Sequence, residues 1–127
     1  PAYAEAISTA LGIPIPPNAP VVGQDAFRTA TGVHAAAVIK AHERMDTWLA
    51  DNVYSGVPAS WIGREQTIDV GPMSGASNVR FALKRLGLAV GDETVAAVLK
   101  VAKESDRTLS DAEIRRVASQ AAAGPPR

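Results

Sequence analysis

The sequence contains no cysteine, which excludes a disulfide framework and any thiol chemistry. It has no apolar stretch near the ~20 residues that a membrane-spanning helix needs, and no signal-peptide pattern opens it. Thirteen basic residues balance thirteen acidic ones, and without a run of like charge the electrostatic footprint of a nucleic-acid or anionic-membrane binder is missing. These absences predict a soluble, cytoplasmic protein that binds neither nucleic acid nor a membrane.

Aromatic residues are scarce, so the core must depend on alanine and branched aliphatic side chains. The chain has two Trp, two Tyr and two Phe among 127 residues, although 46% of it is hydrophobic. Length and composition are those of one globular domain. Because the chain starts at Pro1 and not at an initiator methionine, we expect either a processed start or a piece of a longer protein.

Two different patterns open the chain. Apolar residues at helical spacing predict a helix over about residues 2–11, with Gly12 as its C-cap. Pro14, Pro16, Pro17 and Pro20 exclude a helix in the next segment and favour an extended connector, with an ordinary surface loop as the alternative. We therefore assign residues 1–27 to an N-terminal helix and a proline-rich linker or arm, and residues 28–127 to a helical accessory domain.

The middle of the chain predicts helix first. One helix is expected to open near Gly32 and to continue through Lys40. A second helical segment contains Met45, Trp48 and Leu49, and it is either continuous with the first or separate from it. Met45 and Trp48 share a helical face, which predicts that both are core residues.

A loop and a strand are expected next. Residues 53–65 contain two glycines and a proline, which predicts a loop that carries Tyr54 and Trp61. Trp61 is expected to anchor this loop against the helices, although a ligand-stacking role is an alternative. Residues 66–70 alternate between polar and apolar side chains before Gly71, which predicts one short strand.

The last part of the chain predicts three amphipathic helices. Apolar residues recur at i, i+3, i+4 and i+7 in segments that begin at Val79, Val95 and Ile114. Asp92 and Ser110 occupy expected N-cap positions, and Ser110 with Glu113 forms a capping-box pattern. The predicted fold is therefore mainly α, with one short strand and a C-terminal three-helix cluster.

Two side chains are candidates for moving protons at neutral pH, since imidazole and phenol groups commonly do this. They are His34 and Tyr54. Taken alone, His34 is more often a capping or packed residue than a catalyst, and a loop tyrosine usually packs its ring. His42 lies eight residues from His34, unlike the i, i+4 pair of a helical metal site, so we expect no metal site within this chain.

The glycine-containing segment from Gly71 to Gly75 matches no phosphate-binding fingerprint. Ser74 and Asn78 are explained by a helix N-terminus near Gly75. No Gly-x-Ser-x-Gly elbow occurs, so the sequence gives no basis for a hydrolase triad.

Short motifs follow one another in a characteristic order. They are Val22-Gly23, Ala26-Phe27, Gly32-Val33-His34, Lys40, Tyr54, Val57-Pro58, Ile62-Gly63-Arg64-Glu65 and Ser74-Gly75-Ala76-Ser77-Asn78-Val79. Over roughly residues 7–115, this ordered set resembles the region that follows the barrel in the 2-isopropylmalate synthase and homocitrate synthase family.

The resemblance implies an acyltransferase that condenses acetyl-CoA with a 2-oxo acid, and 2-isopropylmalate synthase of leucine biosynthesis is the expected member. In this family the divalent metal (Mg²⁺ or Mn²⁺) and the 2-oxo acid site lie on a TIM barrel, which this chain lacks. The chain is therefore expected to bind no metal and to be inactive alone. Its implied place is a helical lid over the barrel of a neighbouring protomer in a homodimer, where acetyl-CoA and the 2-oxo acid bind through the barrel.

In the resemblance, His34 and Tyr54 match the histidine and tyrosine that the lid brings to the active site. Which group accepts the proton stays open, and no cofactor-binding residue is assigned. Homocitrate and citramalate synthase are alternatives, because this chain has Ala35-Ala36-Ala37 where family members often have polar residues. An alternative of another class is a free-standing helical module for dimerisation or regulation.

Overall fold

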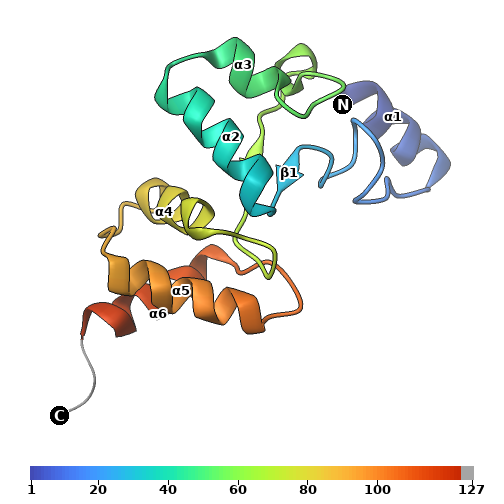
Figure 1. Ribbon diagram of the computed structural model, residues 1–127. Helices are drawn as coiled ribbons and strands as arrows, with labels where there is room; N and C mark the ends of the chain where they lie inside the picture. Colours follow the sequence, from blue (N-terminus) through green and yellow to red (C-terminus); the bar gives the residue numbers. More distant parts are fainter. Residues whose placement is uncertain (124–127) are drawn as a thin grey trace.

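The computed structural model describes residues 1–123 and is built mainly of helices (Figure 1). The helices are α1 (Ala2–Leu11), α2 (Gly32–Glu43), α3 (Thr47–Asn52), α4 (Ala76–Arg85), α5 (Asp92–Glu104) and α6 (Asp111–Ala122), with a 3-10 helix η1 (Ala59–Ile62). The predicted mainly α class is confirmed, and a chain of 127 residues is too short for a TIM barrel. The last four residues of the accessory domain predicted over 28–127 lie outside the described range.

The strands are shorter and more numerous than predicted. β2 (Thr67–Ile68) occupies the middle of the strand expected at residues 66–70. It pairs in parallel with β1 (Arg28–Thr29), with Arg28 opposite Thr67. The sequence pattern did not indicate β1, because a two-residue strand has no detectable alternation.

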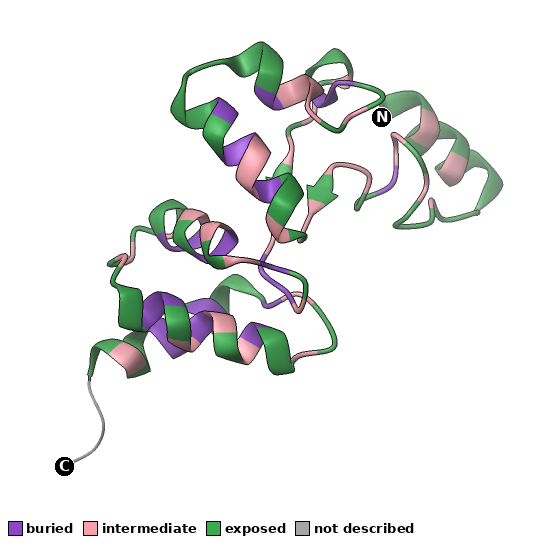
Figure 2. Ribbon diagram, in the orientation of Figure 1, coloured by how far each residue is buried: buried purple, intermediate pink, exposed green. Residues whose placement is uncertain are grey.

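Buried residues form two clusters, one mainly on α4, α5 and α6 and the other mainly on α2 (Figure 2). The larger one, here called the α4–α6 core, contains Val70, Val79, Ala82, Leu83, Val95, Val98, Ala102, Leu109, Ile114, Val117 and Ala118. The smaller one, the α2 core, contains Ala35, Val38, Ile39 and Ile68, with Val53 and Phe81 packed against it. Both consist of small and branched aliphatic residues, as the composition predicts. The two clusters adjoin where α2 contacts α4.

The predicted capping box of α6 is confirmed. The Ser110 hydroxyl accepts a hydrogen bond from the backbone N–H of Glu113, and the Glu113 carboxylate accepts one from the Ser110 N–H at 2.8 Å. Arg107 donates to the same carboxylate at 2.8 and 3.0 Å. The bond from Arg107, together with those from Ser110, lowers the pKa of Glu113 to about 2. The start of α6 is thus set by local interactions.

The prediction of Asp92 as an N-cap is wrong by one residue. Gly91, with an extended backbone, is the N-cap of α5, and Asp92 is the first helical residue. The Asp92 carboxylate accepts from Arg80 of α4 at 2.5 Å instead. Since Asp92 is almost fully exposed, this ion pair contributes about 0–1 kcal/mol and does not determine where α5 begins.

The chain breaks between α2 and α3. Met45 has a φ of +57°, in the left-handed region, so the two helical segments are separate and not continuous. Asn52 is the last residue of α3. The prediction of Met45 and Trp48 as core residues is wrong, because their exposed fractions are 87% and 71%. Met45 lies outside both helices, and Ala50 is the buried residue of α3.

The N-terminal helix α1 has the predicted bounds and ends at Gly12, whose φ of +67° is left-handed. None of its residues is buried, and it projects from the rest of the chain (Figure 1). Residues 17–27 fold into successive turns, in which the Asp25 N–H donates to the Pro17 carbonyl at 2.8 Å. The expected extended connector is therefore wrong for this part of the arm. Across residues 1–123, no helix combines the length and the apolar character of a membrane span.

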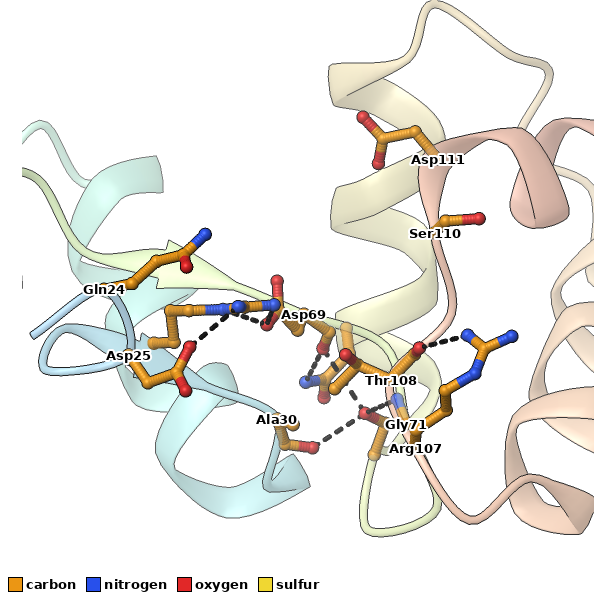
Figure 3. Close-up of polar contacts among 12 residues, drawn as sticks. Gln24, Asp25, Ala30, Asp69, Gly71, Arg107, Thr108, Ser110 and Asp111 are labelled. Carbon is orange, nitrogen blue, oxygen red and sulfur yellow. Dashed lines mark hydrogen bonds and ion pairs between the residues drawn. The ribbon is translucent and has the colours of Figure 1, made fainter. Parts of the chain in front are cut away.

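A buried hydroxyl joins segments that are far apart in the sequence (Figure 3). The Ser74 hydroxyl accepts from the Gly71 N–H at 2.8 Å and donates to the Ala30 carbonyl at 2.7 Å. Ser74 is 2% exposed. It therefore connects the segment after β1 to the turn before α4.

A buried amide completes this junction. Asn78 is fully buried, and its amide nitrogen donates to the Asp69 carbonyl at 3.0 Å, while its amide oxygen accepts from the Gly75 N–H at 3.2 Å. Gly75 is the N-cap of α4, as expected. The Asp69 carboxylate accepts from Arg28 at 2.6 and 2.7 Å, and Arg28 also binds Asp25 (Figure 3). The junction thus ties both strands to the start of α4.

Candidate functional site

The two catalytic candidates lie side by side. His34 is in the first turn of α2, and Tyr54 comes two residues after the end of α3. Their ring centroids are 4.3 Å apart with an interplanar angle of 26°, which is a stacked arrangement. Both side chains are exposed, Tyr54 to 64%. Since stacked rings meet through their faces, the imidazole nitrogens and the phenol oxygen lie at ring edges that do not point at the partner ring.

The position of His34 follows from how α2 begins. Thr31 is the N-cap with an extended backbone, and Gly32 is the first helical residue. A Cβ at Gly32 would lie 3.0 Å from the backbone nitrogen of Gly75, so a larger residue would push the starts of α2 and α4 slightly apart. Next to His34, Ala35 points into the α2 core and is completely buried. The imidazole is thereby left on the outer side of the first turn.

Tyr54 has an unusual backbone. Its φ of +58° is left-handed, which is uncommon for a residue with a bulky side chain. Such a conformation persists when the surrounding structure fixes it, and it is found often at functional sites. The loop predicted over residues 53–65 is present around Tyr54, although residues 59–62 form η1.

A cleft of about 440 Å³ adjoins Tyr54. It lies between the arm and the loop after α3 and is lined by Asn18, Pro20, Val21, Asp25, Ala26, Phe27, Tyr54, Ser55, Gly56 and Val57. Arg64 fixes the arm beside it, donating to the carbonyls of Val21, Gly23 and Gln24 at 2.6 to 3.1 Å. Its guanidinium also lies 5.1 Å from the Phe27 ring centroid. The sequence marked Arg64 only as part of a motif, and its long-range acceptors could not be foreseen.

A larger groove of about 940 Å³ lies elsewhere, between α3 and η1 on one side and α4 and α6 on the other. Trp48 and Trp61 line it, with exposed fractions of 71% and 77%. The expectation that Trp61 anchors its loop against the helices is therefore wrong. At the other side, Arg85 donates to Asp111 at 2.5 and 3.0 Å, and this bond lowers the pKa of the Asp111 carboxyl. His34 and Tyr54 do not line this groove.

The described residues do not fit a metal ion. Within residues 1–123, no three His, Cys, Asp or Glu side chains come together as a possible ligand set. The divalent metal implied by the sequence resemblance therefore has no matching ligands in this part of the chain.

Comparison with known proteins identifies relatives over most of the chain, while no protein-family profile matches it. A putative (R)-citramalate synthase of Methanopyrus kandleri is 29% identical over 110 residues, which is 84% of this chain and 20% of that protein. A homocitrate synthase of Pyrococcus horikoshii is 35% identical over 99 residues, covering 78% and 25%. A probable 2-isopropylmalate synthase of Ignicoccus hospitalis is 33% identical over 97 residues, covering 76% and 22%. The chain thus spans about a fifth to a quarter of the length of these relatives.

Proposed function

Because this chain belongs to the family of citramalate, homocitrate and 2-isopropylmalate synthases, we propose that it is the C-terminal helical part of an enzyme that condenses acetyl-CoA with a 2-oxo acid. We propose 2-isopropylmalate synthase of leucine biosynthesis as the member, with homocitrate and citramalate synthase as alternatives. The chain covers only about a fifth to a quarter of each of these relatives. This supports the proposal that the rest of the enzyme, in a homodimer, binds both substrates.

The observation that carries this proposal is the exposed, stacked pair of His34 and Tyr54. In a Claisen-type condensation, a base removes a methyl proton from acetyl-CoA, and the resulting enolate needs a hydrogen-bond donor. In our proposal the imidazole of His34 accepts this proton, directly or through one water molecule. The hydroxyl of Tyr54 donates to the thioester oxygen, and its ring holds the imidazole plane in place.

The exposure of the pair has a functional meaning in this proposal. Hydrogen bonds to a developing enolate are most effective where water is excluded, but both rings face solvent in this chain. In our proposal the pair therefore becomes catalytic when another part of the enzyme covers it and excludes water. We propose that the ligands of the divalent metal expected for this family lie on that other part of the enzyme, because residues 1–123 hold no cluster of three possible ligands.

The first experiment measures CoA release by the longer polypeptide that carries this sequence. His34→Ala should lower turnover by several orders of magnitude, since it removes a general base that is worth roughly 10²- to 10⁴-fold. His42→Ala is the matched control, because it removes the other exposed histidine of the same helix and should leave turnover within about twofold. Near-normal turnover of His34→Ala would exclude the imidazole from the mechanism.

A substrate panel separates the members of the family. The same polypeptide is assayed with acetyl-CoA, Mg²⁺ and each of 2-oxoisovalerate, 2-oxoglutarate and pyruvate. A preference for 2-oxoisovalerate supports 2-isopropylmalate synthase, and a preference for another acid supports one of the alternatives. The isolated 127-residue chain should release no CoA with any of them, and CoA release would contradict its proposed role as a part without the catalytic barrel.

A further inference from the structure

The left-handed conformation of Tyr54 requires a restraint. A non-glycine residue in a sparsely populated backbone region costs about 1–3 kcal/mol, so the surroundings must hold it there. Burial of the Tyr54 side chain does not supply the restraint, because this side chain is 64% exposed. The Ser55 N–H donates to the Asn52 carbonyl at 3.2 Å and closes a turn across Tyr54, so further contacts must fix this turn relative to the helices.

The side chain of Gln66 contacts the chain on both sides of Tyr54. Its amide nitrogen donates to the carbonyls of Ala50 and Asp51 at 3.0 and 3.2 Å and lies 3.2 Å from the hydroxyl oxygen of Ser55. The two carbonyls belong to the last turn of α3, where helix carbonyls have no intrahelical partner. One amide thus closes the end of α3 and also reaches the residue that follows Tyr54.

Gln66 can serve as a restraint because its own backbone is fixed. The next residue, Thr67, donates its N–H to the Phe27 carbonyl at 2.8 Å as β2 begins. Ile68 follows and is buried in the α2 core, against which His34 is also placed by Ala35. Val53 packs against this core just before Tyr54, and the Gln66 side chain adds a second connection, which reaches past Tyr54 to Ser55.

We propose that Gln66 is a positioning residue that holds the Tyr54 ring over the imidazole of His34. Two carbonyl oxygens face the amide, so position 66 must present a hydrogen-bond donor. Gln66→Glu is nearly isosteric but places carboxylate oxygens against these carbonyls, and it should release the loop. The consequence for turnover rests on the proposed function, whereas the consequence for ring geometry does not.

The test of geometry uses NMR of the 127-residue chain. Stacking on Tyr54 displaces the ring-proton resonances of His34 upfield, and Tyr54→Leu defines their position without the neighbouring ring. In Gln66→Glu and in Gln66→Met, this displacement should be lost, while the dispersed methyl resonances of the α4–α6 core stay unchanged. Gln120→Glu, at an exposed position of α6, is the matched control and should keep the full displacement. Retention of the displacement in both Gln66 variants would overturn the proposal.

The test of consequence uses turnover of the longer polypeptide. Gln66→Glu should lower kcat by roughly 10- to 100-fold, because a misplacement near 1 Å costs about this much. Activity relative to the parent should recover as the pH falls, since a protonated carboxyl at position 66 can donate again, and Gln66→Met should show no such recovery. If Gln66→Glu loses the ring stacking but keeps normal turnover, Gln66 is still a positioning residue. In that case the proposed catalytic role of His34 and Tyr54 is refuted. A Gln66→Glu defect that does not change with pH would contradict the requirement for a donor.

Discussion

The buried amide of Asn78 gives the sharpest test of how the two cores are joined. Its oxygen accepts from the Gly75 N–H, as a helix cap does, and its nitrogen donates to the Asp69 carbonyl. If the cap were its only task, Asn78→Asp would keep the acceptor and gain about 0.3–1 kcal/mol from the helix dipole. If the bond to Asp69 matters, the same substitution must destabilise the protein. The two roles thus predict changes of opposite sign in the free energy of unfolding of Asn78→Asp.

The structure favours destabilisation. Asn78 is 0% exposed, so Asn78→Ala leaves the Gly75 N–H without its acceptor and leaves the Asp69 carbonyl with only the Ser74 hydroxyl at 3.4 Å. An unsatisfied buried group costs about 1–3 kcal/mol. We expect a total loss of roughly 2–4 kcal/mol in the free energy of unfolding, which is less than the sum for two unsatisfied groups because the Asp69 carbonyl keeps one partner. Asn78→Asp also removes the donor, and it buries a negative charge near the Asp69 carbonyl without a compensating cation. Its cost at neutral pH should be about 3–5 kcal/mol, the range for an uncompensated buried charge.

Urea denaturation followed by circular dichroism measures both variants. Asn18→Asp is the control, because Asn18 is exposed and the substitution should change stability by no more than about 0.5 kcal/mol. The difference between Asn78→Asp and Asn78→Ala should shrink on acidification, since a protonated carboxyl can donate to the carbonyl of Asp69. If Asn78→Asp is as stable as the parent at pH 7, the hydrogen bond to the Asp69 carbonyl does not matter for stability, and Asn78 acts only as a helix cap.

Three further outcomes are expected. Leu83→Ala removes a side chain that is 0% exposed in the α4–α6 core and should lower the free energy of unfolding by roughly 2–5 kcal/mol in the same urea assay; a loss below this range would mean that the core repacks. The pKa of Glu113 is lowered from 4.5 to about 2 on folding, so its stabilising contribution is complete above pH 4.5 and is lost as the pH falls toward 2. Urea midpoints recorded across this range should fall less steeply in Glu113→Gln than in the parent. Trp48→Ala and Trp61→Ala should each change stability by no more than about 0.5 kcal/mol, and the parent's fluorescence should show water-exposed indoles; blue-shifted emission would contradict their exposure.

The helices of the α4–α6 core could be predicted because their signals are local. Apolar periodicity fixes the buried face of each helix, and the Ser110–Glu113 capping box fixes the start of α6 within four residues of sequence. Gly87, with a φ of +68°, follows α4 in the left-handed conformation that helix ends favour. The helices of this part therefore follow from local signals, whereas the hydrogen bond from the Leu109 N–H to the Val70 carbonyl at 2.8 Å joins segments that are far apart in the sequence.

The region around the α2 core was predicted less well, for two physical reasons. A left-handed Met45 breaks a helical pattern that looks continuous, and a methionine gives no sequence signal for such a conformation. The pairing of β1 with β2 joins residues 28 and 67, and a ladder of two residues has no periodicity that could reveal it. Exposed tryptophans at 48 and 61 then follow from a chain path that local patterns do not specify.

The candidate site was predicted to a limited extent. His34 and Tyr54 were named together through the family resemblance, whereas each residue alone had a more ordinary explanation. Their stacking depends on the break at Met45, which returns α3 toward the start of α2. The contacts of Gln66 could not be foreseen, because they reach across 11 to 16 positions of sequence to backbone carbonyls and a hydroxyl.

The division into two cores explains how this chain can keep a strained residue at an exposed site. Four buried side chains form the α2 core and eleven form the α4–α6 core, so most hydrophobic stabilisation comes from helices that do not carry the candidate pair. The α2 core is small, so its packing against Val53 and the turn hydrogen bond from Ser55 to Asn52 are supplemented by the polar contacts of Gln66 in holding Tyr54 in the left-handed region. Ser74 links the segment before α2 to the turn before α4 through a buried hydrogen bond, and Asn78 links the residue after β2 to the start of α4. These hydrogen bonds attach the segment before the first turn of α2, where His34 lies, to the larger α4–α6 core.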